Sequence, residues 1–519
     1  MSTRSRKGCI DCKKAKVKCD EVHPFCGTCK RRRRQCSGYN QPPRSQTSVD
    51  DAGSRNTPVT PNAQLVTTAS PSDSSRLSSE GRSLDGATIP TAAFSPLIDS
   101  SNGTISPVAT SSSLMISTRV PRTVPSIPAG TIDPVDEPFI ELYFRRHPRE
   151  LVFGPEFVHE MNSNVLKVFQ NSPLAVGDSL SAIGEAYCKD SSLAVAVPIA
   201  SRKARILARL RTMDNLGVSM ELLLSIILGL CAVELVDAND DQHNISSLPT
   251  LLDNICMMLD HHLRTTHELS HLSKYFLRAL ARQDMLLSLT ILHPARIPTS
   301  WWLDDYSITH ADRFMGYTTT LMPLLSRLSG LAADVRTYGL EMLDSDNTIE
   351  LTFPRHASNQ GDLLDRASAL LDELHSWHPT VDPTLSFQAS RKFFMHAHCS
   401  RQAALLYLHR LFNPPSSSVE ADQTALGMAY EVMAHTTNHA EDMKMSLWPV
   451  FVASCEMQSE EDRLSATEIL NPICSGRKTI TALRTRNFVA HRVWAARDAG
   501  LNWDWMSLNL QYPNELLPI

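Results

Sequence analysis

The chain has 519 residues, of which 42% are hydrophobic, so it is long enough for more than one domain and apolar enough to bury a large core. Its net charge of −5 hides an uneven distribution, because residues 1–40 carry +9 and the rest of the chain therefore carries −14. The start of the chain lacks the apolar segment of a secretory signal, and the longest apolar run, residues 222–236, is shorter than the roughly twenty residues of a membrane-spanning helix. We therefore expect a protein of a reducing compartment that has no membrane partner and whose basic end binds a polyanion.

Six cysteines near the start of the chain follow the spacing C-x2-C-x6-C-x6-C-x2-C-x6-C. They are Cys9, Cys12, Cys19, Cys26, Cys29 and Cys36. A C-x2-C pair can present two thiolates to one metal ion, and a reducing compartment argues against disulfide bonds. Zinc is favoured because it suits an all-thiolate site, although iron–sulfur centres also use thiolates.

The number of cysteines constrains the zinc site further. Two four-coordinate ions need eight ligand positions, so six thiolates suffice only if two of them bridge both ions. The alternative is a single zinc ribbon that uses Cys9, Cys12, Cys26 and Cys29 and leaves the third cysteine of each half without a role. The repeated spacing favours the binuclear site, and we expect the folding of so small a module to depend on zinc.

These residues resemble the Zn2Cys6 binuclear cluster of fungal transcription regulators, because all six cysteines and Pro24 in the connecting loop match the pattern of that family. The resemblance implies that Cys9 and Cys26 bridge two Zn²⁺ ions. One ion would then bind Cys9, Cys12, Cys19 and Cys26, and the other would bind Cys26, Cys29, Cys36 and Cys9. It also implies double-stranded DNA as the partner and the nucleus as the location.

Both halves of the cysteine pattern contain a basic gap, which suits contact with the phosphate backbone of DNA. Selection of a sequence also requires a side chain that reaches base edges in the major groove. The resemblance assigns this role to Lys16, which would read guanine in a CGG-type triplet; Ala15 stands where the family often has a basic residue. The phosphate contacts would come from Lys13, Lys14 and Lys18.

The second gap is a continuous basic run formed by Lys30, Arg31, Arg32, Arg33 and Arg34. Such a run could contact phosphates, act as a nuclear import signal, or do both. No apolar heptads follow the cysteines in residues 37–53, and two consecutive prolines interrupt that stretch. A coiled-coil dimer is therefore not expected there, and the protein would bind DNA as a monomer or dimerise through a later domain.

Composition divides the chain into residues 1–40, a linker at 41–131, and a domain at 132–519. The linker is rich in Ser, Thr and Pro and lacks a persistent hydrophobic period, so it is predicted to be disordered. From residue 132 onward, apolar residues recur at intervals of three and four, which predicts one large all-α domain. The fold class is therefore mostly α, with the apolar run at 222–236 as a buried helix and the six later cysteines as buried packing residues.

Four stretches of the large domain resemble the helical domain that follows the zinc cluster in many fungal regulators. They are "FIELYFRRHPRELVF", "ARQDMLLSL", "LWPVFVASCE" and "FVAHRVWAARDAG". The resemblance implies a regulatory region that senses a small-molecule effector, inhibits the protein or contacts coactivators. The C-terminal segment from Leu501 mixes tryptophans, leucines and acidic residues, so it is interpreted either as a transactivation segment or as part of the core.

The stretch "HELSH" satisfies the H-E-x-x-H pattern of zinc peptidases. On a helix, His267 and His271 would share one face, with Glu268 as a general base. A catalytic site needs a third protein ligand, and neither the extended motif nor a nearby downstream glutamate is present. We therefore predict that the protein is not an enzyme.

Together these patterns predict a nuclear, zinc-dependent regulator of RNA polymerase II genes that binds specific DNA sequences. Two other classes compete with this prediction: a zinc-ribbon adaptor that binds protein or RNA, and the metallopeptidase, which the missing third ligand argues against. A DNA footprint that requires two zinc ions would separate the regulator from the adaptor.

Overall fold

A computed structural model describes two parts of the chain. The described residues are 9–14, 17, 19, 26, 28–29, 32 and 36, followed by 130–188, 198–213, 219–237, 247–266, 268–343, 359–436, 442, 444–477 and 479–519. The chain divides into two compact units, Met1–Ser111 and Ser112–Ile519. Nearly all of the predicted linker lies outside the described residues, so the boundaries at 40 and 131 stay predictions.

In the N-terminal unit, the described residues include the short helix α1 at Ile10–Lys14. This helix begins directly after Cys9 and contains Cys12, so the first C-x2-C pair lies at its start. The corresponding residues of the second half, Thr28 and Cys29, are also helical. The two halves of the cysteine pattern therefore adopt related local structure.

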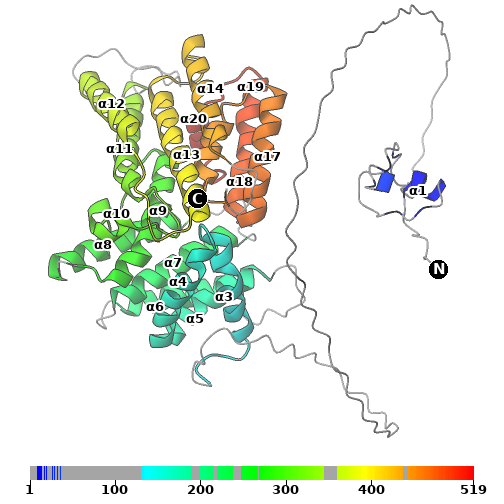
Figure 1. Cartoon of the computed structure of the whole chain (residues 1–519). Helices are drawn as coiled ribbons and strands as arrows, with labels where there is room; N and C mark the ends of the chain where they lie inside the picture. Colours follow the sequence, from blue (N-terminus) through cyan, green and yellow to red (C-terminus); the bar gives the residue numbers. More distant parts are fainter. Residues whose placement is uncertain are drawn as a thin grey trace, which may run out of the picture. The chain divides into compact units, whose positions relative to one another are not determined.

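The C-terminal unit is built from helices, and its described residues contain no β-strand, only an isolated bridge between Asp312 and Gly316 (Figure 1). The helices of its first half are α3 (Glu137–Leu151), η1 (Pro155–Phe157), α4 (Val158–Asn171), α5 (Pro173–Ala186), α6 (Ile199–Met213), α7 (Met220–Val236), α8 (Leu248–Thr266), α9 (His271–Ile291), η2 (Thr299–Trp301), α10 (Asp305–Thr309), η3 (Thr319–Leu321) and α11 (Met322–Leu343). The second half contains α12 (Asn359–Ser376), α13 (Phe387–Phe412), α14 (Val419–Ala434), α16 (Leu447–Ser454), α17 (Glu460–Arg477), α18 (Ile480–Phe488), the π-helical turn η4 (Val489–Trp494), α19 (Ala495–Asp498) and α20 (Trp505–Gln511). The prediction of a mostly α fold is confirmed. No helix in the described part of the chain is long and apolar enough to cross a membrane.

Helix α7 confirms the prediction of a buried helix at residues 222–236. Eleven of its seventeen residues are buried, because it is apolar on all sides and other helices surround it. It packs against both α5 and α9. Its start is capped by the hydroxyl of Ser219, which accepts a hydrogen bond from the backbone N–H of Leu222.

Two glycines allow the helices around α5 to approach one another closely. A Cβ atom on Gly184 of α5 would lie 2.0 Å from the carbonyl oxygen of Phe139 in α3, and one on Gly229 of α7 would lie 2.7 Å from the Cβ of Ser179 in α5. Any larger residue would force these helices apart. In Figure 1 the helices α3 to α7 gather in the lower part of the domain, and α11 to α14 lie above them with α17 to α20.

The C-terminal segment is part of the core, which decides between its two interpretations. Trp503, Trp505 and Ile519 are buried, and α20 packs against α9. The side-chain amide of Asn509 donates a hydrogen bond of 2.9 Å to the carbonyl oxygen of Thr290. The tryptophans that suggested a transactivation segment therefore serve as packing residues.

The structure shows that the helix expected at the "HELSH" motif is absent. Helix α8 ends at Thr266 and α9 begins at His271, so Glu268 lies in the connection between them, while His267 lies outside the described residues. The break has a local cause: the Ser270 hydroxyl caps α9 by accepting a hydrogen bond of 3.1 Å from the N–H of Ser273. The expectation that the two histidines share one helix face was wrong.

Candidate metal centre

The six N-terminal cysteines form one cluster, and five of them are buried. Two groups of sulfur atoms lie within 4.8 Å of one another: Cys9, Cys12, Cys19 and Cys26 form the first group, and Cys9, Cys29 and Cys36 form the second. Cys9 belongs to both groups. Among the described residues, these are the only sets of His, Cys, Asp and Glu side chains that could hold a metal ion.

The spacing of the sulfur atoms fits zinc. Four thiolates at about 2.3 Å from a Zn²⁺ ion in tetrahedral geometry are about 3.8 Å apart from one another. Within the first group, the Sγ atom of Cys26 lies 3.4 Å from that of Cys19 and 3.6 Å from that of Cys12, and within the second group the Sγ atom of Cys29 lies 3.8 Å from that of Cys9. The Sγ atom of Cys29 also lies 3.7 Å from that of Cys12, which is a contact between the two groups. The donor atoms are therefore already spaced as the ligands of a tetrahedral ion.

Backbone N–H groups point at these sulfur atoms. The N–H of Cys9 donates to the sulfur of Cys19 at 3.3 Å, and the N–H of Cys26 donates to the sulfur of Cys36, also at 3.3 Å. The N–H of Cys12 donates to the sulfur of Cys9 at 3.4 Å. Such hydrogen bonds orient metal ligands and offset part of the negative charge of a thiolate cluster.

Burial without a cation would keep these thiols protonated. It raises the pKa of Cys9 to about 12, and it also raises the pKa of Cys12 and Cys29 above the ordinary value. A metal ion reverses this effect, because a coordinated thiol loses its proton. The chemistry of this donor set therefore fits zinc, which would supply charge neutralisation and a rigid cross-link in place of a hydrophobic core.

The structure describes only some of the basic residues that the sequence singles out. Lys13 and Lys14 belong to α1 next to Cys12, and the side chain of Lys14 is exposed. Arg32 is exposed in a turn in which its N–H donates to the carbonyl oxygen of Thr28 at 3.2 Å. The remaining predicted DNA-binding residues lie outside the described part: Lys16, Lys18, Lys30, Arg31, Arg33 and Arg34.

The helical unit contains a cavity whose residues the sequence analysis did not name. Arg282, Arg313 and Arg477 line it together with apolar side chains from several helices. In the sequence, each of these arginines is indistinguishable from an ordinary surface residue. The only local signal is Arg282, which stands among apolar residues in "ARQDMLLSL".

Two family models match the chain. The model of the fungal specific transcription factor domain matches residues 178–514, and that of the fungal Zn(2)-Cys(6) binuclear cluster domain matches residues 7–46. The first match covers most of the helical unit, and the second covers the cysteine cluster.

Curated relatives match over a short region only. An uncharacterized transcriptional regulatory protein of Schizosaccharomyces pombe is 41% identical over 56 residues, which are 11% of this chain and 10% of the relative. The transcriptional regulatory protein moc3 of the same organism is 38% identical over 55 residues, again 11% of this chain and 10% of the relative. White-opaque regulator 2 of Candida albicans is 40% identical over 57 residues, 10% of this chain and 13% of the relative. The chain thus spans about a tenth of the length of these relatives. No solved structure matches it.

Proposed function

Because the chain belongs to the family of proteins with a fungal specific transcription factor domain, we propose that it is a nuclear, zinc-dependent regulator that binds double-stranded DNA at specific sequences. The observation that carries this proposal is the six-cysteine cluster in the middle of a strongly basic segment. A rigid scaffold with a high positive charge suits the phosphate backbone, and a single helix can present side chains to the major groove.

The cluster would hold two Zn²⁺ ions. In this arrangement Cys9, Cys12, Cys19 and Cys26 bind one ion, while Cys26, Cys29, Cys36 and Cys9 bind the other. The membership of Cys9 in both sulfur groups supports its role as a bridge. The short distances from Cys26 to Cys12 and Cys19 support its place in the first set, and its bridging role is part of the proposal. A single zinc ribbon would leave Cys19 and Cys36 beside a metal that they do not bind.

The charge of this module would then favour DNA over other partners. Residues 1–40 keep about +7 when two Zn²⁺ ions offset four of the six thiolate charges. Lys16 would read guanine in a CGG-type triplet, and the phosphate contacts would come from Lys13, Lys14, Lys18, Lys30, Arg31, Arg32, Arg33 and Arg34. The basic run after Cys29 would also direct the protein to the nucleus, where it would regulate genes of RNA polymerase II.

The helical domain would act as the regulatory part, through a small-molecule effector or a coactivator. It supplies no arrangement that favours catalysis: within the described residues, the metal-binding groups are confined to the cysteine cluster. The broken helix at the "HELSH" motif also argues against a peptidase site, because His271 begins a new helix.

The experiment that tests the proposed function combines metal analysis with DNA footprinting on the full-length protein. We expect two zinc ions per chain and a protected site that disappears when a chelator removes the metal. One zinc per chain, with no loss on replacing Cys19 and Cys36, would show a zinc ribbon instead. Binding to RNA or protein without any protected DNA site would favour an adaptor.

A further inference from the structure

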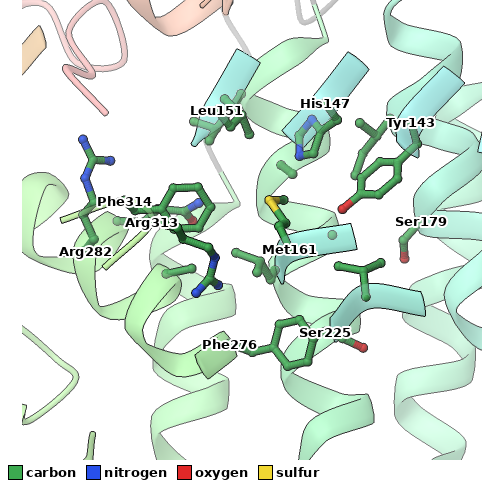
Figure 2. A pocket seen from close by; sticks show the side chains of 18 of the residues that line it. Tyr143, His147, Leu151, Met161, Ser179, Ser225, Phe276, Arg282, Arg313 and Phe314 are labelled. Carbon is green, nitrogen blue, oxygen red and sulfur yellow. The ribbon is translucent and has the colours of Figure 1, made fainter. Parts of the chain in front are cut away.

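The helical domain contains a cavity of about 60 Å³ that is lined mainly by α3, α4, α5, α7 and α9, with Arg477 of α17 also in its wall. Figure 2 shows its lining side chains, with Tyr143 and Ser179 at one end and Arg282 at the other. Leu151, Met161 and Phe276 contribute apolar walls. Basic side chains therefore lie at one end of the cavity, at Arg282, and also between its apolar walls, at Arg313.

Three buried guanidinium groups line this cavity. Arg282 is 9% exposed and makes no hydrogen bond or ion pair with any described residue. Arg477 is 2% exposed and donates one long hydrogen bond of 3.4 Å to a carbonyl oxygen, while its Nε atom has no partner among the described residues. Arg313 donates to the carbonyl oxygen of Tyr275 at 2.9 Å, and its Nε and Nη1 atoms form no hydrogen bond in the described structure.

Negative charge near these groups is scarce. None of the described residues that line the cavity has an acidic side chain, although Ile519, the last residue of the sequence, lines it with its α-carboxyl group. Asp312 lies close by, but its carboxylate accepts a hydrogen bond of 3.0 Å from Arg278 and lies 3.9 Å from Arg313. Glu160 is half-buried, and its pKa responds to the charges of Arg278 and Arg313 rather than to Arg282 or Arg477. Arg282 and Arg477 thus form no ion pair with a carboxylate among the described residues, although the charge of Asp312 acts on Arg282 and partly opposes the lowering of its pKa.

An unpaired buried cation is costly, because the protein interior replaces only a small part of its hydration. Burial accordingly lowers the pKa of Arg282 to about 9, with a further contribution from the charge of Arg477, and it lowers the pKa of Arg477 to about 10. An anion that enters the cavity would remove this cost and gain charge-assisted hydrogen bonds. Three further polar atoms in the cavity wall lack partners among the described residues: the hydroxyl oxygens of Ser179 and Tyr275, whose O–H groups can donate to an anion, and Gln283 Oε1, which can only accept.

We propose that this cavity binds a small organic carboxylate, with its carboxylate group paired to the guanidinium groups of Arg282 and Arg477 and its short apolar part against the apolar side chains of the cavity wall. The volume limits the size of the ligand: about 150 Å³ accommodates benzene, so about 60 Å³ suits a chain of roughly two to four carbon atoms. The apolar walls favour a carboxylate over an inorganic anion, because phosphate would leave them in contact with a fully polar ligand.

Binding would join distant parts of the domain. Arg282 belongs to α9, and Arg477 is the last residue of α17, so a carboxylate held by both would link the two halves of the helical unit. The binding site is a property of this unit alone. Only its use as an effector site rests on the proposed function, and the test below requires neither zinc nor DNA.

The test follows propionate binding to the full-length protein by isothermal titration calorimetry and by the thermal unfolding of the helical signal. We expect propionate to bind and to raise the Tm, whereas sodium chloride at equal ionic strength, inorganic phosphate and the neutral analogue propionamide leave the Tm unchanged. An equal shift with propionamide would show that charge plays no part. An equal shift with phosphate or chloride would show a general anion effect. Either result, or no binding of propionate, overturns the proposal.

Substitutions of the two arginines test whether propionate binds in this cavity. Arg282→Met and Arg477→Met should each weaken propionate binding about 10- to 100-fold, the effect of losing hydrogen bonds to a charged group. Arg282→Met should also raise the Tm of the free protein, because it removes an unpaired buried charge.

Arg264→Met is the matched control, since that side chain is 76% exposed and pairs with Asp260 on the surface. This variant should bind propionate as the unmodified protein does. If Arg282→Met does not fold, Arg282→Lys keeps the charge and should retain part of the affinity. Unchanged binding in Arg282→Lys and Arg477→Met together would refute the assignment.

Discussion

The Sγ atom of Cys12 lies 3.6 Å from the Sγ atom of Cys26, although fourteen positions separate them in the chain. This contact joins the two halves of the cysteine pattern, each of which places its C-x2-C pair at a short helical turn. A distance so close to the edge of a zinc–thiolate tetrahedron means that one metal ion can bind both halves at once. The integrity of the module should therefore depend on the cysteines that the halves share.

Replacing a shared cysteine should disrupt the whole module. We expect Cys26→Ser to reduce the zinc content from two ions per chain to one or none and to abolish DNA binding, while the thermal transition of the helical domain stays unchanged. Metal analysis and calorimetry measure the two effects. The control is Cys474→Ser, because this buried thiol donates to the carbonyl oxygen of Ala482 at 3.4 Å and belongs to a separate core cluster. Two zinc ions retained in Cys26→Ser would contradict the shared ligand.

The proposed base reader can be separated from phosphate contacts. Lys16→Ala should weaken binding to the cognate DNA by about 1–3 kcal/mol and spare most of the binding to scrambled DNA, because only base contacts carry sequence information. Lys14→Ala, at an exposed position of α1, should weaken both equally. Fluorescence anisotropy with both DNA duplexes measures the difference. Equal losses for Lys16→Ala on the two duplexes would show that Lys16 contacts phosphate alone.

A buried ion pair in the helical domain should matter far more than an exposed one. Arg410 donates from Nε and Nη2 to the two carboxylate oxygens of Glu456 at 2.9 Å and 2.5 Å, and both side chains are buried. Glu456→Gln leaves the arginine partly unpaired, so it should lower the free energy of unfolding by about 3 kcal/mol. The control Glu373→Gln removes the exposed pair with Arg327 and should change the free energy of unfolding far less, because solvent screens that pair. Urea unfolding of both variants checks this; equal costs would contradict the role of burial.

The free energy of unfolding of the helical domain should decrease at low pH, in part because Asp312 becomes protonated. Burial alone would raise the pKa of this carboxyl, but the charges of Arg313 and Arg278 and the N–H groups of Phe314 and Met315 outweigh it and lower the pKa below its ordinary value. A lowered pKa contributes stability above the unfolded value of about 4, and this contribution is lost as the pH falls through the folded pKa.

We therefore expect Asp312→Asn to lower the free energy of unfolding at pH 7 and this difference to shrink as the pH falls below about 4. Urea unfolding, followed by the helical signal over a pH series, measures it. A difference that stays constant from pH 7 to pH 3 would show that the ionised form of Asp312 contributes nothing.

Because the C-terminal segment packs into the core, its buried side chains should contribute to the free energy of unfolding of the helical domain. Trp505 is buried, with its ring centroid 5.1 Å from that of Phe451 and 5.7 Å from that of Tyr407. Trp505→Ala should lower the free energy of unfolding by about 3–5 kcal/mol because it leaves a cavity. Leu501→Ala, at a side chain that is 65% exposed, should change it little. Urea unfolding compares the two; a Trp505→Ala variant as stable as the unmodified protein would contradict the packing role of Trp505.

Some properties of this protein follow from the sequence alone because they depend on residues close together in the chain. The spacing of Cys9, Cys12 and Cys19 places thiolates within reach of one ion whatever the rest of the chain does, so the metal cluster could be predicted. The apolar residues at 222–236 likewise predicted a buried helix, because a helix with no polar face must be surrounded by protein. Composition and periodicity were enough for the mostly α fold.

Other properties depended on how distant segments pack. The "HELSH" motif matched a pattern that is typical of a single helix, yet Ser270 within the motif caps the start of a new helix, α9. Whether one helix or a break forms at this position is decided by the fold of the whole chain. The sequence allowed Trp505 to face either the solvent or the core, and its ring contact with Phe451 shows that it faces the core. Arg282 and Arg477 lie almost two hundred positions apart, and the only local sign of burial is the apolar sequence around Arg282. Tertiary packing brings these two arginines to one cavity. Burying a charge costs free energy, and this cost is offset by contacts between segments that are far apart in the sequence rather than by the neighbours of each arginine in the chain.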